Sequence, residues 1–176
     1  TKDSYNRSAK PPVTRASTIL FNSMQELQQH SKKIKAHKKI SYYDYGRYGS
    51  STTIELENII KELEQAYHVF LTATGFGGVS LALFSLCRPG DEILVSDNVY
   101  DPTKEIASKL LNEFNVTAKF YNPESFDDLK NKISNKTKMI LVENPGSNTF
   151  EFQDLSKIIN LAKKKNILTF LDNTWG

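Results

Sequence analysis

The sequence contains a single cysteine, Cys87, among its 176 residues. One cysteine excludes an internal disulfide, and this is typical of proteins kept in a reducing compartment. Cys87 follows the mostly apolar residues 83–86, so a buried structural thiol is favoured over a nucleophile. We therefore expect a cytoplasmic protein.

Long apolar runs are also missing, since no stretch approaches the ~20 apolar residues of a membrane-spanning helix. No secretory signal is visible at the start. His30, His37 and His68 are far apart and lack neighbouring cysteines or closely spaced carboxylates, which argues against a metal site. No Ser-His-Asp triad is evident either. The sequence thus predicts a protein without metal or membrane binding.

Neither sign of charge dominates the sequence. The formal net charge is only +3, and the basic residues are scattered. This argues against nucleic acid as a partner. The densest basic run, residues 32–39, is interpreted as a solvated helix face, with RNA or membrane-surface binding as the alternative. With 39% hydrophobic and 24% charged residues, the chain is typical of one globular domain or most of a larger one.

The chain changes character near residue 50. Residues 1–50 are polar and irregular, rich in lysine and tyrosine, with one expected helix at 23–35. We predict that this segment is an amino-terminal arm and that residues 51–176 form an α/β domain. A helix containing Leu56, Ile59, Ile60 and Leu63 is expected to begin with a capping box of Thr52 and Glu55.

Beyond this helix, strands and helices alternate, which indicates βαβ units and a mostly parallel sheet. A turn is expected at 88–91 from its proline and glycine. The five expected strands are 68–73, 92–96, 116–121, 138–143 and 167–172. Between them we expect an apolar helix that follows the glycines 75–78 and ends at residue 87, and helices at 102–114, 125–133 and 153–165.

The segment Thr74-Gly75-Phe76-Gly77-Gly78 joins an expected strand to an expected helix. Glycines at such a junction let backbone amides approach an anion, and the positive end of the helix dipole favours phosphate. The pattern matches neither a P-loop nor the Rossmann fingerprint. Close packing at a tight turn explains it equally well, so a phosphate cradle at Gly75 and Phe76 is one of two interpretations.

Four further residues carry chemistry suited to a phosphorylated ring. Tyr100 follows the strand 92–96 and can stack on a planar heteroaromatic ring, or be an ordinary half-buried tyrosine. Asp172 ends an apolar strand and can pair with a protonated ring nitrogen, or cap a helix. Arg47, beside Tyr45 in a tyrosine-rich loop, offers a bidentate fork for phosphate. Self-association of that loop through its aromatic side chains is the alternative.

The order and spacing of these motifs resemble the cystathionine β-lyase family, pyridoxal-phosphate (PLP) enzymes of cysteine and methionine metabolism. The resemblance covers nearly the whole chain from about residue 11. Pro145-Gly146-Ser147 and Trp175 favour the β-lyases over the γ-lyase and γ-synthase relatives. The matching motifs are Arg15-Ala16-Ser17-Thr18, Tyr45-Gly46-Arg47, Glu62-Leu63-Glu64, Thr74-Gly75, Pro89-Gly90-Asp91, Tyr100-Asp101-Pro102, Glu143-Asn144-Pro145-Gly146 and Asp172-Asn173-Thr174-Trp175.

The resemblance implies a fold, a cofactor and roles for particular residues. The fold would be part of the three-layer, mostly parallel α/β large domain of the aspartate-aminotransferase-like PLP enzymes. Gly75 and Phe76 would bind the PLP phosphate, Tyr100 would stack on the ring, and Asp172 would pair with its nitrogen. Tyr45 and Arg47 would reach a neighbouring subunit's cofactor, which implies a homo-oligomer, a dimer or tetramer. Tyr45 and Tyr100 would also take part in catalysis.

The implied reaction acts on an amino-acid thioether: cystathionine would give homocysteine, pyruvate and ammonia. The family's Schiff-base lysine, phosphate-binding Ser/Thr pair, carboxylate-binding arginine and small carboxyl-terminal domain would all follow Gly176. Phe76 is bulkier than the residue often found at its position. We therefore expect this fragment to be inactive alone, and oligomeric or prone to aggregate through an exposed sheet edge. A non-catalytic remnant and an interaction module are the alternatives.

Overall fold

The computed structural model describes residues 12–37 and 45–176. The chain divides into two compact units, residues 1–71 and 72–176, and each is described by itself below. The division falls later than the predicted boundary near residue 50, because the helix that follows that boundary belongs to the first unit. The predicted functional domains 1–50 and 51–176 remain predictions.

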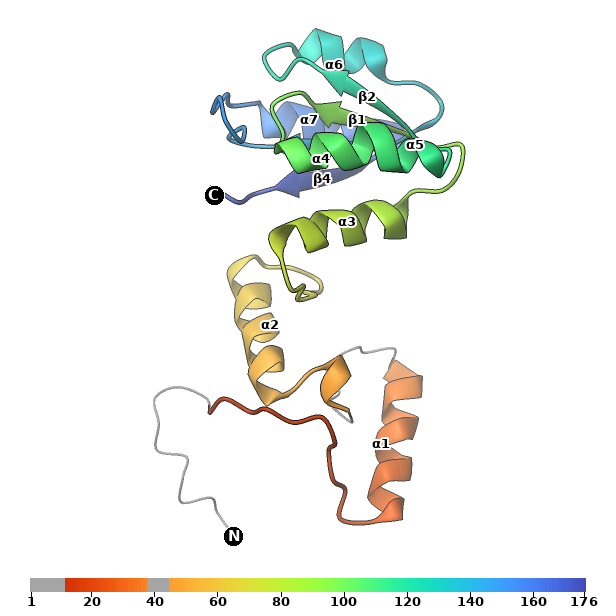
Figure 1. Cartoon of the computed structure of the whole chain (residues 1–176), viewed down its shortest axis with the longest axis vertical. Helices are drawn as coiled ribbons and strands as arrows, with labels where there is room; N and C mark the ends of the chain where they lie inside the picture. Colours follow the sequence, from red (N-terminus) through yellow and green to blue (C-terminus); the bar gives the residue numbers. More distant parts are fainter. Residues whose placement is uncertain (1–11, 38–44) are drawn as a thin grey trace. The chain divides into compact units, whose positions relative to one another are not determined.

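A parallel sheet forms the centre of the second unit (Figure 1). Its strands are β1 (Glu92–Ser96), β2 (Thr117–Tyr121), β3 (Thr137–Glu143) and β4 (Leu168–Asp172). They lie in the order β2-β1-β3-β4, and every neighbouring pair is parallel. The predicted α/β class and parallel sheet are therefore confirmed. Because all strands run the same way, the residues that follow them meet at one edge, called the carboxyl edge here.

Helices cover both faces of this sheet, which confirms the predicted three layers. On one face, α3 (Gly75–Leu86), α4 (Asp101–Glu105) and α5 (Leu111–Glu113) pack on a core that includes Leu83, Ile93 and Leu141. On the other face, α6 (Phe126–Lys132) and α7 (Leu155–Lys165) pack on a second core that includes Leu94 and Ile140. The alternation of Ile93 and Leu94 between the two cores follows from the two-residue period of a strand.

The expected helix at 102–114 is one continuous run with a π-helical segment, η2 (Ile106–Leu110), between α4 and α5. The turn before β1 also forms as expected. The amide of Asp91 donates to the carbonyl oxygen of Arg88 at 3.0 Å, and Gly90 takes a φ of +95°. A positive φ at the residue after proline is the geometry of a type II turn, which favours glycine.

One predicted strand is wrong. Residues 68–73 form no strand, and the sheet of the described residues has four strands rather than five. Apolar and β-branched residues there favour an extended chain, but a strand exists only where a neighbour accepts its backbone hydrogen bonds. No strand among the described residues lies beside this segment.

The first unit contains α1 (Met24–His37), the 3-10 turn η1 (Gly46–Tyr48) and α2 (Ser51–Leu63). The predicted capping box of Thr52 and Glu55 is wrong. The helix begins earlier, and Ser50 forms the box with Thr53. Thr52 instead accepts the amide hydrogen of Thr14 at 2.7 Å.

The predicted helix at 23–35 is confirmed by α1, and Lys32 on it is exposed. The other side chains of the basic run 32–39 lie outside those described. Within the described ranges, no helix is long and apolar enough to cross a membrane. The same ranges contain no group of three or more His, Cys, Asp or Glu side chains placed to hold a metal ion.

Candidate cofactor site

The start of α3 presents backbone amides to open space. Thr74 caps the helix, because its Oγ1 accepts the amide hydrogen of Gly77 at 2.9 Å. The structure records no hydrogen bond from the amides of Gly75 and Phe76, which precede this cap bond. A Cβ built on Gly75 would meet no atom within 4 Å. The junction is therefore not closed by packing, and its free amides and helix dipole suit a phosphate.

Tyr100 stands at the carboxyl edge, where it caps α4. Its carbonyl oxygen accepts the amide hydrogens of Thr103 at 2.8 Å and Lys104 at 3.2 Å. Its own amide donates to Oε2 of Glu143 at 2.7 Å. The side chain is 48% exposed. The backbone of Tyr100 is thus held from both sides, while its ring remains accessible for stacking.

Asp172 ends β4 at the same edge. It lies in parallel register with Glu143 of β3, and its carbonyl oxygen accepts the amide hydrogen of Asn144 at 3.4 Å. Its Oδ1 accepts hydrogens from the amide of Thr174 at 3.1 Å and the hydroxyl of Thr174 at 2.5 Å. A turn rather than a helix follows, so Asp172 is not a helix cap here. No described residue donates a hydrogen bond to its Oδ2, which leaves that oxygen for a ligand.

The electrostatics of this edge favour a cation beside Asp172. Glu143 is only 4% exposed, and burial, reinforced by the nearby charge of Asp172, raises its pKa. Hydrogen bonds from the Tyr100 amide and from Ser147 oppose that rise in the pKa of Glu143. Asp172, with Oδ2 open, therefore suits a protonated ring nitrogen, and the anionic end of the ligand belongs at the α3 amides.

A buried polar network, which the sequence did not predict, fixes the loops of the carboxyl edge. Gln153 lies at its centre: Oε1 accepts the Tyr121 hydroxyl at 2.9 Å, and Nε2 donates to Ser96 Oγ at 2.9 Å. The same Nε2 donates to the carbonyl oxygen of Glu143 at 3.3 Å. Ser96 donates in turn to Asn98 at 2.5 Å. Burial raises the pKa of Tyr121, so its hydroxyl stays a donor.

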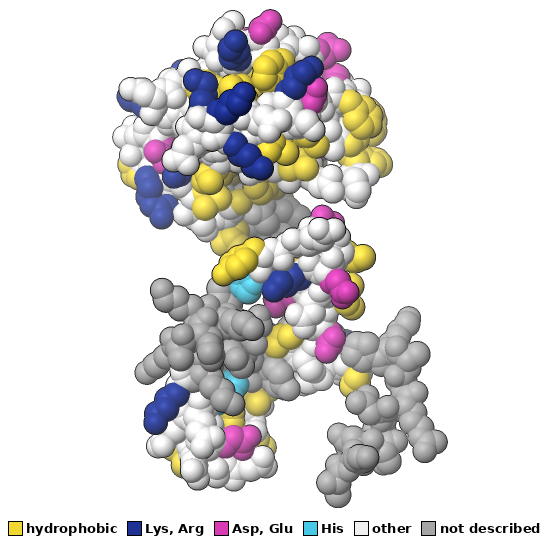
Figure 2. Space-filling view, turned by 180° about the vertical axis from the view of Figure 1, so that it is seen from behind, with side chains coloured by type: hydrophobic (Ala, Val, Ile, Leu, Met, Phe, Trp, Pro, Cys, Tyr) yellow, Lys and Arg dark blue, Asp and Glu magenta, His cyan; other side chains and the backbone are white. Residues whose placement is uncertain are grey.

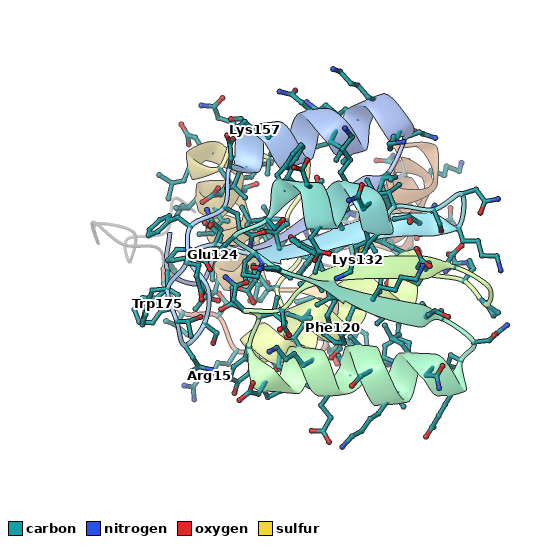
Figure 3. The ribbon with its side chains drawn as sticks, turned by 90° about the horizontal axis from the view of Figure 1, so that it is seen from above. Arg15, Phe120, Glu124, Lys132, Lys157 and Trp175 are labelled. Carbon is teal, nitrogen blue, oxygen red and sulfur yellow. The ribbon has the colours of Figure 1, made fainter. Side chains whose placement is uncertain are left out.

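An aromatic pair includes Trp175, three residues after Asp172 in the sequence. The rings of Phe150 and Trp175 meet edge to face, with centroids 5.2 Å apart, and both side chains are about half exposed. Phe150 takes a φ of +60°, which bulky residues rarely adopt. Figure 3 labels Trp175 at the left of the view. Figure 2 shows hydrophobic side chains gathered at the rim of this unit on the side where the strands end. The pair gives this edge an apolar wall.

In the first unit, Tyr45 and Arg47 are brought together. Tyr45 forms a β-bridge with Thr18, and the Arg47 guanidinium lies 4.9 Å from the centroid of the Tyr45 ring. Hydrogen bonds from Arg47 and then Ser17 lower the pKa of Tyr45. Gly46 is required between them, since a Cβ there would lie 1.8 Å from the carbonyl oxygen of Ala16. Tyr45 and Arg47 thus contact each other within the unit, and their predicted contact with a neighbouring subunit's cofactor stays a prediction.

The remaining predicted site residues all belong to the second unit. Tyr100 and Asp172 meet through Glu143, as the carboxyl-edge argument expected. Figure 1 shows α3 starting on the side of this unit where the strands end. Since α3 precedes β1 and runs against it, Gly75 and Phe76 face the same side. The second unit therefore combines an anion cradle, a stacking ring and a carboxylate, which together suit a phosphorylated, cationic heteroaromatic ligand.

The whole chain, residues 1–176, matches the sequence profile of a family described as Cys/Met metabolism PLP-dependent enzymes. The chain belongs to this family. The predicted resemblance is confirmed, and the family's cofactor, PLP, is the kind of ligand that the second unit suits.

Individual relatives are similar over almost all of this chain. A Saccharomyces cerevisiae protein provisionally named a cystathionine β-lyase is 36% identical over 99% of this chain and 48% of its own length. A cystathionine β-lyase of Bordetella avium is 33% identical over 94% of this chain and 41% of its own. An L-alanine/L-glutamate racemase of Wolbachia pipientis is 28% identical. The chain thus spans less than half the length of these relatives.

Solved structures agree on the fold. The cystathionine γ-lyase of Lactobacillus plantarum, complexed with L-serine, matches with a TM-score of 0.76 and 25% identity over 92% of this chain and 38% of its own. The metB protein of Corynebacterium glutamicum matches with a TM-score of 0.83 and 23% identity over 97% of this chain and 41% of its own.

Proposed function

We propose that this chain is the amino-terminal part of a PLP-dependent carbon–sulfur β-lyase and that it supplies most of the non-covalent contacts to the cofactor. Family membership supports the proposal. The observation that carries it is the open cradle at the start of α3, where a Cβ on Gly75 would meet nothing within 4 Å. A glycine needed only for close packing would have protein atoms in the space where its Cβ would lie.

Each proposed residue has one task. The amides of Gly75 and Phe76 hold the phosphate, and the bulk of Phe76 does not interfere because an amide donor needs no side chain. The free oxygen of Asp172 accepts the hydrogen of the protonated ring nitrogen, and Tyr100 stacks on the ring. When bound, PLP supplies an electron sink for the carbanion that forms when the α-proton of an amino acid is removed.

The substrate is proposed to be an amino-acid thioether, with cystathionine giving homocysteine, pyruvate and ammonia. The names of the Saccharomyces cerevisiae and Bordetella avium relatives support this choice. The racemase among the relatives shows that similar chains serve other reactions on amino acids. Tyr45, with its lowered pKa, and Arg47 are proposed to reach the cofactor phosphate of a neighbouring subunit of a cytoplasmic homo-oligomer.

Among the described residues, the lysines of α4 and α7 are poorly placed for covalent chemistry with the ring. Lys163–Lys165 end α7, and β4 then runs back toward Asp172. Its four residue steps separate the two ends by ~13 Å. Lys104 and Lys157 lie near the carboxyl edge, but each forms an ion pair. Lys104 pairs with Asp97 at 3.1 Å, and Lys157 pairs with Asp154 at 3.0 Å. We propose that the Schiff-base lysine belongs to the remainder of a longer protein and that this chain alone is inactive.

An absorption spectrum of the purified chain with added PLP, before and after borohydride, tests these proposals. We expect reversible binding without a lysine adduct in the visible region, and no peptide labelled after reduction. Asp172→Ala should weaken the binding, whereas Asp154→Ala, which alters the acid that caps α7, should not. Specific labelling of Lys104 or Lys157 would overturn the proposed inactivity. Absence of any binding would leave the non-catalytic alternatives, a remnant or an interaction module.

Sizing chromatography tests the proposed association. The outer edge of β4 pairs with no strand of the described residues, and Leu168 and Leu171 on it are each 39% exposed. Such an edge invites pairing with another chain. We expect a dimer or larger species that Leu168→Lys shifts toward monomer, with Leu110→Lys on η2 as a control at equal exposure, 39%. A clean monomer with a sharp thermal transition would contradict the proposal.

A further inference from the structure

Glu143 is a buried carboxylate at the centre of the candidate site to which no role has been assigned. It is the last residue of β3 and is 4% exposed. Its Oε2 accepts the amide hydrogen of Tyr100, 43 residues earlier in the chain, at 2.7 Å. Its backbone lies in register with Asp172 on β4. One residue therefore touches the loop that carries the stacking ring and the strand that carries the acid.

The contact sets the direction of the Tyr100 ring. Tyr100 is the residue before α4, where the amide has no helical partner. Among the described residues, Glu143 is the one acceptor recorded for the Tyr100 amide. Its own φ of −49° and ψ of 132° fix where the side chain leaves the backbone. A short hydrogen bond to a buried carboxylate is among the stronger protein hydrogen bonds, and its loss frees that backbone to move.

We propose that Glu143 is a positioning residue, which holds the Tyr100 ring at a fixed place relative to Asp172 so that stacking and pairing act on the same bound ring. This inference rests on the proposed PLP site. Glu143 acts by accepting a hydrogen bond and contacts no reacting atom. The carboxylate charge is therefore not required, and a neutral acceptor of the same length preserves the function.

Three variants separate this role from general packing. Glu143→Met keeps the volume and removes the acceptor, and Glu143→Gln keeps an acceptor without the charge. Glu143→Ala serves as a second acceptor-free variant in case methionine distorts the site. The matched control is Glu92→Met, because Glu92 is also buried, at 6% exposure, but begins β1 at the opposite edge of the sheet.

Titration of each full chain with PLP, followed by the fluorescence of Trp175, its only tryptophan, gives the first readout. We expect Glu143→Met to weaken PLP binding roughly tenfold, the value of one hydrogen bond. Glu143→Gln and Glu92→Met should bind PLP nearly as the parent does. In a Tyr100→Ala background, Glu143→Met should have no further effect, because the two residues act as a unit. Additive effects of the two changes would overturn the proposal.

Hydrogen exchange of the Tyr100 amide, without PLP, gives a second readout that a purely structural role would not reproduce. Exchange should be slow in the parent chain, in Glu143→Gln and in Glu92→Met, and fast in Glu143→Met. Unchanged exchange in Glu143→Met would refute the inference. If the parent chain binds no PLP, the proposed function fails, and the exchange result still decides whether Glu143 holds Tyr100.

Discussion

Gly75→Ala should stabilise the fold and weaken the cofactor site at the same time. The glycine begins α3, and a Cβ there meets no protein atom within 4 Å. Its φ lies outside the left-handed region, since Gly49 and Gly90 are the glycines with positive φ among the described residues. Alanine therefore fits the backbone without strain. The space that its Cβ would take is the space where the proposed phosphate oxygens meet the amides.

The two effects have opposite signs and separate causes. Replacing glycine by alanine at a compatible position raises the free energy of unfolding by about 0.4–1 kcal/mol, because the unfolded chain loses conformational freedom. That gain corresponds to an increase of ~1–4 °C in Tm for a chain of this size. Displacing the phosphate from one amide costs a charge-assisted hydrogen bond, which corresponds to a loss of roughly tenfold or more in PLP affinity.

Gly78→Ala is the matched control for this prediction. Its Cβ would make ordinary contact with Thr72 Oγ1 at 3.5 Å, and the Gly78 amide already donates to the Thr74 carbonyl oxygen at 3.2 Å. It should therefore stabilise the helix without changing PLP affinity. Thermal unfolding and PLP titration of the two variants measure both quantities. Equal PLP affinities for Gly75→Ala and Gly78→Ala would refute the cradle, whatever their stabilities.

Further predictions concern stability in the second unit. Burial favours the neutral form of Glu92, but hydrogen bonds from its neighbours outweigh this and lower its pKa, so stability should fall as pH drops through that pKa. Urea titrations should show that Glu92→Gln flattens this acid limb. Glu143 has a raised pKa, so its contribution is present in acid and lost as pH rises; Glu143→Gln should raise the free energy of unfolding near neutral pH. Tyr121→Phe leaves the buried oxygen of Gln153 without its donor at 2.9 Å, which should cost about 1–3 kcal/mol in denaturant unfolding. Asn166 ends α7 with φ +56°, so Asn166→Ala should cost about 1 kcal/mol by the same assay, whereas Asn166→Gly should cost little.

Local sequence signals predicted the elements of the second unit well where a turn and an apolar run coincide. The strand 92–96 has the predicted bounds, because the turn at 88–91 ends one element and five buried residues follow it. The prediction of a strand at 68–73 was wrong because a strand forms only where a neighbouring strand accepts its backbone hydrogen bonds. The predicted N-cap of α2 was two residues too late. Ser50 and Thr52 both have side chains that can cap a helix, and only the backbone geometry decides between them.

In the candidate site, too, some features could be predicted from the sequence and others could not. Tyr100 and Asp172 could be predicted, because position at the end of a parallel strand already places a side chain at the ligand edge. The contacts that hold them could not. Glu143 accepts a hydrogen bond from Tyr100, 43 residues away in the sequence, and Gln153 donates one to Ser96, 57 residues away. No local spacing encodes such pairs, which exist only once the order β2-β1-β3-β4 brings the strand ends together.

The same topology separates binding from covalent chemistry within this chain. Parallel strands gather the amides of α3, the Tyr100 ring and the Asp172 carboxylate at one edge. The helices that return the chain leave Lys163–Lys165 at the other edge. Lys104 lies nearer the site, but its amine pairs with Asp97 at 3.1 Å. If the proposed roles hold, this part of the fold binds and orients a phosphorylated ring without a lysine, and we expect its cofactor contacts to be measurable in the absence of catalysis.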